Sequence, residues 1–213
     1  MRTGRPRAFC VEETLDRAMT VFWRHGYEGA SMSDLTAAMG INSPSLYACF
    51  GSKEGLFRAV LERYDERRKS FMESVLAAPT AAEAAKTYLH GVADFAIDTS
   101  GKNPPGCLLL QSGLSCGDSD IPDEMARHRA EKEAALCDRF TRARKEGDLP
   151  KAADPAALAR YLMAVSNGIC VQASSGASAD DLHEVASMAL MSWPAGGKPT
   201  KPVKARKKTS VEA

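Results

Sequence analysis

Hydrophobic residues recur every three or four positions along most of the chain, which is the spacing of one face of an α-helix. Between positions 11 and 26 this spacing places Leu15, Ala18 and Phe22 on one stripe, and Gly26 follows as a helix stop. No segment alternates apolar and polar residues as a half-buried strand does. The pattern therefore predicts an all-α fold.

Two short helices are predicted next, separated by a tight turn. Ser31 or Ser33 caps the first of them, which ends at Gly40. Ser43 caps the second, with Pro44 at its first helical position, where the missing N–H costs nothing. The link between the two helices has the length of the turn in a helix-turn-helix unit.

A long fourth helix and five later segments complete the pattern. Ser52 caps the fourth helix, which runs from Lys53 to about Ala77. From Gly196 onward the chain is rich in Lys, Pro and Gly without apolar periodicity, which predicts a disordered tail. The later segments with helical spacing are 80–98, 106–116, 120–146, 154–175 and 178–193.

The formal net charge of +1 conceals three unequal parts. Residues 1–70 carry +2, residues 71–197 carry −6 and residues 198–213 carry +5. A near-neutral total argues against binding of nucleic acid by bulk charge, but the basic ends favour it locally. Arg2, Arg5 and Arg7 indicate either a solvated terminus or an arm that reaches DNA.

Several classes of protein are not expected. No apolar run is long enough for a membrane span or an export signal, so we expect a cytoplasmic protein. Six cysteines without short framework spacing are expected to be free thiols. Neither a metal site nor a cofactor is predicted, because the four histidines lack ligand spacing. No nucleophile elbow or phosphate-binding glycine loop indicates an enzyme.

The most informative stretch is residues 26–57, which read GYEGASMSDLTAAMGINSPSLYACFGSKEGLF. It combines an aromatic-glycine end of the first helix, a serine entering the second and a Gly-Ile turn. A Ser-Leu-Tyr-x-x-Phe third helix and a Gly-Ser-Lys-Glu-x-Leu-Phe start of the fourth follow. This combination closely resembles the DNA-binding domain of the TetR family of transcriptional repressors. Cys49 stands where histidine is frequent in that family.

The resemblance implies a division of the chain into three parts. Residues 1–52 would form a three-helix helix-turn-helix domain that binds DNA. The long fourth helix would join it to a larger helical domain, residues 53–195, for ligand binding and dimerisation. Residues 196–213 would remain a basic tail.

The predicted DNA-contacting residues lie at the starts of the second, third and fourth helices. Small polar side chains and free N–H groups at a helix start suit phosphates and base edges. By resemblance Tyr47 faces the DNA backbone, whereas a buried tyrosine is the alternative. The predicted set is Ser31, Ser33, Asn42, Ser43, Pro44, Ser45, Tyr47 and Lys53.

The resemblance also implies a homodimer, in which the last two predicted helices pair with their copies. A dimer fits the symmetry of a palindromic operator, because two recognition helices must meet two half-sites. The side chains expected on the pairing faces are Leu158, Leu162, Val165 and Ile169, and Leu182, Val185, Met188 and Ala189.

Four residues are candidates for sensing a small molecule. Cys107 opens a short apolar helix that also carries Gln111, and a similar Gly-Cys-Leu segment occurs in family members that respond to electrophiles or oxidants. The alternative is a cysteine packed as a small hydrophobe. His128 and Lys132 lie on an apolar stripe, where they either address an anionic ligand or extend to water.

The leading hypothesis is thus a dimeric, sequence-specific repressor that a small-molecule effector releases from double-stranded operator DNA. Two other classes remain as alternatives. One is a thiol-based enzyme, which would need a histidine paired with Cys107. The other is a non-specific architectural DNA binder that uses both basic ends.

Overall fold

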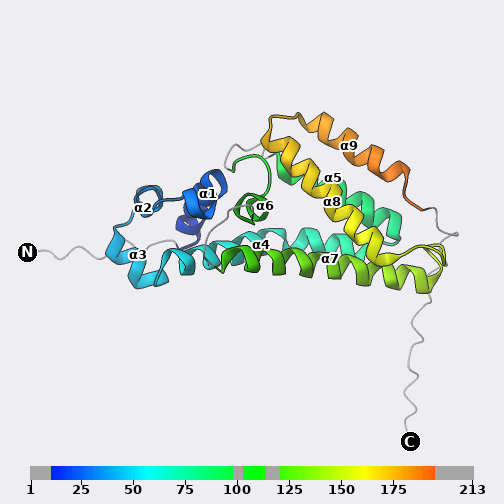
Figure 1. The fold of residues 1–213 in the computed structure, drawn as a ribbon, viewed down its shortest axis with the longest axis horizontal. Coiled ribbons are helices and arrows are strands. Elements are labelled where there is room, and N and C mark those ends of the chain that lie inside the picture. Colours follow the sequence, from blue (N-terminus) through cyan, green and yellow to red (C-terminus); the bar gives the residue numbers. More distant parts are fainter. Residues whose placement is uncertain (1–10, 98–102, 114–119, 195–213) are drawn as a thin grey trace, which may run out of the picture.

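The computed structural model describes residues 11–97, 103–113 and 120–194, and the predicted basic arm and tail lie outside them. Within these ranges the chain forms nine α-helices and no strand, which confirms the all-α fold. The helices, drawn in Figure 1, are α1 (Val11–Gly29), α2 (Met32–Met39), α3 (Ser43–Phe50), α4 (Lys53–Ala77), α5 (Ala81–Ala96), α6 (Leu108–Gly113), α7 (Ile121–Glu146), α8 (Pro155–Ser174) and α9 (Ala179–Met191).

Glycine and a capping serine set the ends of the first helices. The backbone of α1 leaves the helical conformation at Gly26, where φ is 69°. α2 begins after its cap, Ser31, and ends at Gly40, whose φ is also 69°. Glycine adopts this left-handed backbone without steric cost. The chain therefore turns sharply at both positions, and α1, α2 and α3 fold against one another.

The cap of α3 differs from the prediction. The side-chain oxygen of Asn42, rather than Ser43, accepts a hydrogen bond from the Ser45 N–H at 2.9 Å. Ser43 is the first residue of the helix, and Pro44 follows it. Asn and Ser are equally good caps, so residue preference alone does not separate two neighbouring candidates.

The long helix α4 joins the two ends of the molecule. Ser52 caps it as predicted, accepting a hydrogen bond from the Gly55 N–H at 3.0 Å. A side chain at position 55 would place its Cβ 2.1 Å from the Phe50 carbonyl oxygen, so glycine lets α3 and α4 meet closely. Figure 1 shows α4 and α7 side by side along the long axis, with α2 and α3 at one end.

Two hydrophobic cores lie along this axis. The N-terminal core joins α1, α2 and α3 to the first half of α4, and it also takes four residues from α6 and α7, namely Leu108, Leu109, Ile121 and Met125. The C-terminal core joins the end of α4 to α5, α7, α8 and α9. Because α4 and α7 contribute to both cores, the predicted domain boundary after residue 52 remains a prediction.

The expected pairing faces of α8 and α9 need a correction. Leu162, Ile169 and Leu182 are fully buried within the chain, where they belong to the C-terminal core, so the prediction that they face a partner is wrong. α8 packs against α5 and α7, and these contacts bury the most regular apolar stripe of α8. Val185 and Met188 do remain exposed, by 42% and 61%.

None of the described helices is long and apolar enough to cross a membrane.

Candidate DNA-binding surface and thiol centre

The outer face of α3 is polar, and its inner face is anchored by one leucine. Leu46 is fully buried in the N-terminal core, while the next residue, Tyr47, exposes 50% of its surface. Asn42, Ser43 and Ser45 are exposed at the start of the helix. The side-chain amide N–H groups of Asn42 stay available, because only its oxygen serves as the cap. This face has the polarity expected of a recognition helix.

The start of α2 is held by a capping box. The Ser31 hydroxyl oxygen accepts from the Asp34 N–H at 3.1 Å and the hydroxyl donates to the Asp34 carboxylate at 2.6 Å. This hydrogen bond from Ser31 is the main reason why the pKa of Asp34 lies below its ordinary value. Ser33, the second residue of α2, is exposed. Ser31 is thus engaged in capping, and Ser33 has the freer hydroxyl.

Lys53 lies at the start of α4 but folds back onto α1. Its Nζ atom lies 4.6 Å from the centroid of the Tyr27 ring and donates to the Glu28 carbonyl oxygen at 3.4 Å. Burial lowers the pKa of Lys53, and the nearby Glu28 partly opposes this. The contact with Tyr27 was not foreseen from the sequence, because it joins the end of α1 to the start of α4, which are separated by α2 and α3.

The structure therefore gathers most of the predicted DNA-contacting residues at one end of the molecule, where α2 and α3 lie (Figure 1). Whether these residues bind DNA stays a prediction.

A second group of functional side chains surrounds Cys107, directly before α6. The Cys107 thiol lies 3.2 Å from the Tyr64 hydroxyl and in hydrogen-bonding contact with the Cys170 thiol of α8. We call Cys107, Cys170, Tyr64 and Arg68 the thiol centre. Its members come from α4, the segment before α6, and α8, so no sequence pattern could have grouped them.

The thiol centre favours the ionised form of one cysteine. The hydrogen bond from Cys170 holds the pKa of Cys107 well below its ordinary value, and Arg68 and Tyr64 act in the same direction against the effect of burial. The same hydrogen bond, together with burial, raises the pKa of Cys170. The ionised form is therefore favoured at Cys107 rather than at Cys170, whose thiol donates the hydrogen bond.

Arg68 supplies the positive charge of the thiol centre. Its guanidinium carbon lies 4.5 Å from the centroid of the Tyr64 ring and 5.0 Å from that of Phe95. Among the described residues no carboxylate within ion-pairing distance partners it. A stacked, unpaired guanidinium beside a thiol stabilises the thiolate.

A cavity of about 700 Å³ lies between α4, α5 and α7. His128 and Lys132 line it, yet both bond to the Asp65 carboxylate of α4, at 3.1 Å and 3.3 Å. Apart from His128, the carboxylates around this cavity equal the Lys and Arg side chains in number, and Phe71, with other apolar residues, forms part of its wall. Gln111, the remaining candidate, is exposed on α6.

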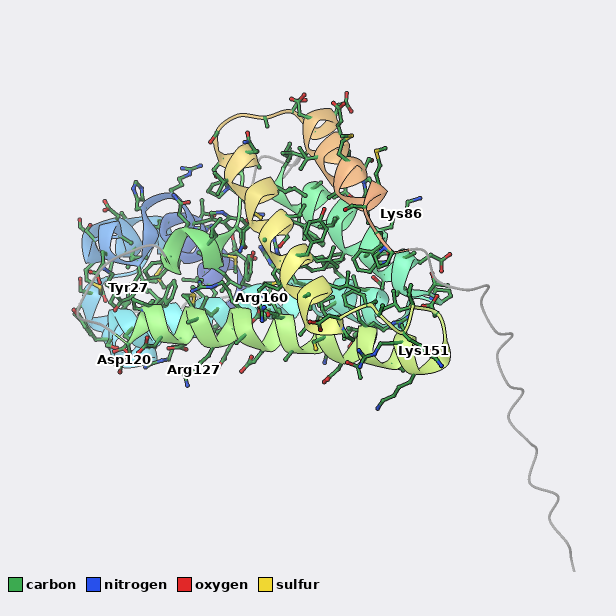
Figure 2. All side chains as sticks on the ribbon, turned by 45° about the vertical axis from the view of Figure 1, so that its right-hand side comes forward. Tyr27, Lys86, Asp120, Arg127, Lys151 and Arg160 are labelled. Carbon is green, nitrogen blue, oxygen red and sulfur yellow. The ribbon has the colours of Figure 1, made fainter. Side chains whose placement is uncertain are left out.

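Figure 2 shows how α7 divides its side chains between solvent and this interior. Arg127 points away from the helix bundle in Figure 2, whereas the next residue, His128, bonds to the Asp65 carboxylate of α4. The two candidates on α7 therefore share one carboxylate and link two helices, rather than forming a free anion site.

A second cavity, of about 720 Å³, lies between α1, α4 and α5. Trp23, Tyr64 and Phe95 give it an aromatic wall, and Arg68 borders both cavities. Two members of the thiol centre, Tyr64 and Arg68, thus line a cavity that also borders the N-terminal core.

Two histidines meet between α5 and α9, which their sequence spacing did not indicate. The Nδ1 atoms of His90 and His183 are 2.8 Å apart, and Nε2 of His183 lies 3.0 Å from the Asp94 carboxylate. Burial lowers the pKa of His90, and the neighbouring His183 adds to the effect. In the described part of the chain no group of three or more side chains is arranged to hold a metal ion.

Comparison with known proteins gives these features a family context. Residues 15–60 match the model of the bacterial regulatory proteins of the tetR family. The chain is 35% identical to the HTH-type transcriptional repressor ComR of Escherichia coli (strain K12), over 90% of this chain and 92% of that protein. It is 28% identical to the HTH-type transcriptional repressor BdcR of the same organism, over 87% and 90%.

Solved structures agree. A cysteine mutant of the TetR family regulator CifR, complexed with 26-base-pair operator DNA, superposes with a TM-score of 0.83 and 38% identity, covering 89% of this chain and 100% of that one. The reduced form of E. coli NemR shares the fold, with a TM-score of 0.69 and 20% identity over 84% and 94% of the two chains.

Proposed function

Because the chain belongs to the TetR family of transcriptional regulators, we propose that it is a dimeric repressor that binds a palindromic DNA operator and is released by a small-molecule effector. The observation that carries this proposal is the exposed polar face of α3, with Tyr47 outward and Leu46 inward. Residues 1–52 would contact DNA, residues 53–195 would bind the effector and dimerise, and residues 196–213 would be a basic tail.

The DNA contacts divide by chemistry. Asn42, Ser43 and Ser45, with Pro44 between them, would enter the major groove at the start of α3 and touch base edges. Tyr47 and Lys53 would contact phosphates, for which Lys53 would have to leave the Tyr27 ring. At the start of α2, Ser31 and Ser33 would fix the position of the helix on the backbone of the DNA.

The dimer would use the exposed apolar side of α8 and α9. Tyr161 and Val171 of α8 and Val185, Met188 and Met191 of α9 are large hydrophobic residues that expose between 37% and 79% of their surface. Gly168, on α8, has open space around it, which would let a partner helix approach. Apolar residues gathered on two neighbouring helices favour burial in a symmetric interface.

The effector would act in the region between the two cores. The cavity between α4, α5 and α7 offers an apolar wall and a balanced charge, which suits an uncharged organic molecule better than a strong anion. Cys107 offers a second route, because its lowered pKa makes it a nucleophile for an electrophile or an oxidant. In either case the effector must bind or modify the conformation that holds DNA less well.

Selection of bound sequences from random duplexes tests the DNA-binding part of this proposal. We expect an inverted repeat whose half-sites lie about one helical turn apart, at 10–10.5 base pairs centre to centre or a multiple. Enrichment of a single unrepeated site would contradict the dimer. Equal binding of random duplexes and selected ones would favour the non-specific architectural alternative and would contradict the proposal of a sequence-specific repressor.

A further inference from the structure

The backbone brings Cys107 and Cys170 together, independently of the rotamers of their side chains. Gly106 has a φ of 101°, and a Cβ added there would lie 3.2 Å from the Cys170 carbonyl oxygen. The Gly106 N–H is fixed by a hydrogen bond to the Ala96 carbonyl oxygen at 2.8 Å. The chain before α6 is therefore held against α8 at Cys170, and the side chains of Cys107 and Cys170 are hydrogen-bonding neighbours. A disulfide requires two Cα atoms within about 7 Å of each other, and this close approach of the two segments favours such a distance.

The two thiols differ in access and in charge. Cys107 is half-buried, whereas Cys170 is 6% exposed. Cys107 also has Tyr64 and Arg68 as polar neighbours, while Cys170 packs in the C-terminal core. One cysteine is thus placed to meet a reagent, and the other is placed to react only with the first.

We propose that Cys107 and Cys170 are the attacking and the resolving thiol of a site that hydroperoxides oxidise to an intrachain disulfide. Hydroperoxides are then the oxidants that Cys107 senses, and Cys170 is the second residue of the sensor. The effect of this oxidation on DNA binding rests on the proposed function. In the structure all four described cysteines carry free thiols, namely Cys49, Cys107, Cys137 and Cys170.

The oxidation proceeds in two steps. The Cys107 thiolate attacks one oxygen of the hydroperoxide, an S–O bond forms, the O–O bond breaks, and the leaving oxygen takes a proton and departs as an alcohol, or as water from hydrogen peroxide. The Cys170 sulfur then attacks the Cys107 sulfenic acid. An S–S bond forms, the S–O bond breaks, and the hydroxide leaves with the Cys170 proton as water. Two thiols are oxidised, and one peroxide is reduced.

The position of α6 links this bond to the DNA-binding end. Leu108 and Leu109 follow Cys107 directly and are buried in the N-terminal core, where α6 packs against α1. A disulfide shortens the sulfur–sulfur contact to about 2.05 Å, which draws the start of α6 toward α8. Because packed cores transmit displacement rather than absorb it, α1 and the helices that it supports would shift.

Treatment of the reduced full-length protein with hydrogen peroxide, followed by peptide mapping, tests the chemical step. We expect one intrachain peptide pair, Cys107 joined to Cys170, that a thiol reductant reverses. Disulfide pairing of Cys107 with any other cysteine, such as Cys116, would overturn the proposal. So would oxidation of Cys107 that stops at sulfenic acid in the wild-type chain.

Two variants separate the roles of the thiols. In Cys170→Ala the sulfenic acid has no resolving thiol, so peroxide should leave Cys107 reactive toward dimedone; Cys170→Ser should behave alike if alanine disturbs folding. The matched control Cys137→Ser should form the disulfide as the wild type does. Absence of dimedone labelling in both Cys170 variants, with the disulfide present in the wild type, would contradict the order of attack.

Operator binding measured before and after peroxide separates this inference from the proposed function. Reduced wild type and reduced Cys170→Ala should bind the selected operator equally, and the disulfide form of the wild type should bind roughly tenfold more weakly. Failure of the reduced protein to prefer any operator would refute the proposed function alone. Formation of the disulfide without loss of affinity would refute the regulatory part of this inference and leave the repressor intact.

Discussion

The end of the molecule that carries α2 and α3, which we call the DNA-facing end after its proposed role, and the thiol centre are built in opposite ways. At the DNA-facing end, the polar residues of α2 and α3 are exposed, and their local contacts reach three residues along the chain, as between Ser31 and Asp34. In the thiol centre, Tyr64 and Cys107 are 43 residues apart in the sequence and meet in the interior. The proposed DNA-binding surface can therefore change residue by residue, whereas the thiol centre depends on how three segments pack.

The two regions are nevertheless joined mechanically. Cys107 packs against both cores, and α6 and α7 supply residues to the N-terminal core although they follow it by many positions. A change at the thiol centre can reach α1 through this shared packing and through Tyr64, whose ring packs edge-on against Trp23 of α1 with centroids 5.5 Å apart. The packing of Cys107, α6 and α7 between the two cores, rather than either end of the molecule, therefore decides whether DNA binding and thiol oxidation are coupled.

Removing a buried aromatic ring from each core should have the largest effect. Phe57 packs edge-on against Phe22 with ring centroids 4.9 Å apart, and Phe140 packs against Trp193 at 5.2 Å. Phe57→Ala and Phe140→Ala should each lower the free energy of unfolding by about 3–5 kcal/mol. Because α4 and α7 run through both cores, each variant should lower the urea midpoint of both regions together.

The two tryptophans report on the regions separately. Trp23 lies in the N-terminal core and Trp193 packs against the C-terminal one. Neither indole N–H has a hydrogen-bond partner among the described residues, so Trp→Phe backgrounds lose no hydrogen bond. Fluorescence in the Trp193→Phe and Trp23→Phe backgrounds, at one fixed protein concentration, then follows each region alone. A Phe57→Ala change that moves only the Trp23 transition would show two independent domains.

An intermediate effect is expected at the DNA-facing end alone. Tyr47→Ala removes a half-exposed side chain, so the free energy of unfolding should change by less than about 0.5 kcal/mol. Affinity for the selected operator and for random duplexes should both fall, by roughly tenfold, since a hydrogen bond to a charged phosphate is lost. Fluorescence anisotropy at several salt concentrations measures this.

A matched control for Tyr47→Ala lies at the far end of the molecule. Lys151 is exposed after α7, away from α3 (Figures 1 and 2). Lys151→Ala removes a positive charge there and should leave DNA affinity unchanged. Unaltered affinity in Tyr47→Ala, or an equal loss in both variants, would mean that α3 does not contact the DNA backbone through Tyr47.

The smallest effect on stability is expected from substitutions in two capping boxes that have the same chemistry. The pKa of Asp34 is lowered mainly by the Ser31 hydroxyl, and that of Asp181 mainly by the Ser178 hydroxyl. A lowered pKa in the folded state stabilises the protein above the ordinary carboxyl value of about 3.9, and this contribution is lost as pH falls through the folded value. Asp34→Asn and Asp181→Asn should therefore each lower Tm slightly at pH 6, with the difference from wild type closing toward pH 3.

DNA affinity then distinguishes the two boxes. Only Asp34→Asn disturbs a serine in the proposed DNA surface, so it should weaken operator binding while Asp181→Asn should not. Equal affinity of both variants would indicate that Ser31 serves α2 only as a cap. Thermal unfolding followed by circular dichroism and anisotropy titrations on the same samples give both readouts.

Much of the fold was predictable because helix ends depend on neighbouring residues. Ser52 caps α4 and Gly40 ends α2, as the sequence predicted. Asn42 took the place of Ser43 at α3 because two adjacent side chains were equally suited to the same N–H group.

What packs against each helix could not be read from the same pattern. Leu162 and Leu182 have the spacing of an interface stripe, but they face the core of their own chain, and the exposed apolar residues lie beside them. Periodicity states that a face is apolar, not which surface covers it. The contact of Cys107 with Cys170, and the unpaired Arg68 near them, are unpredictable for the same reason.

The sequence by itself determined the helices, their caps and the helix-turn-helix motif, since all of these rest on contacts within a few residues. The tertiary structure alone decided that Cys107 lies beside Tyr64 and Cys170, which lower the pKa of its thiol, that His128 and Lys132 share Asp65, and that α6 belongs to the N-terminal core. Each of these depends on the distance between segments far apart in the chain, which is set by close packing of side chains.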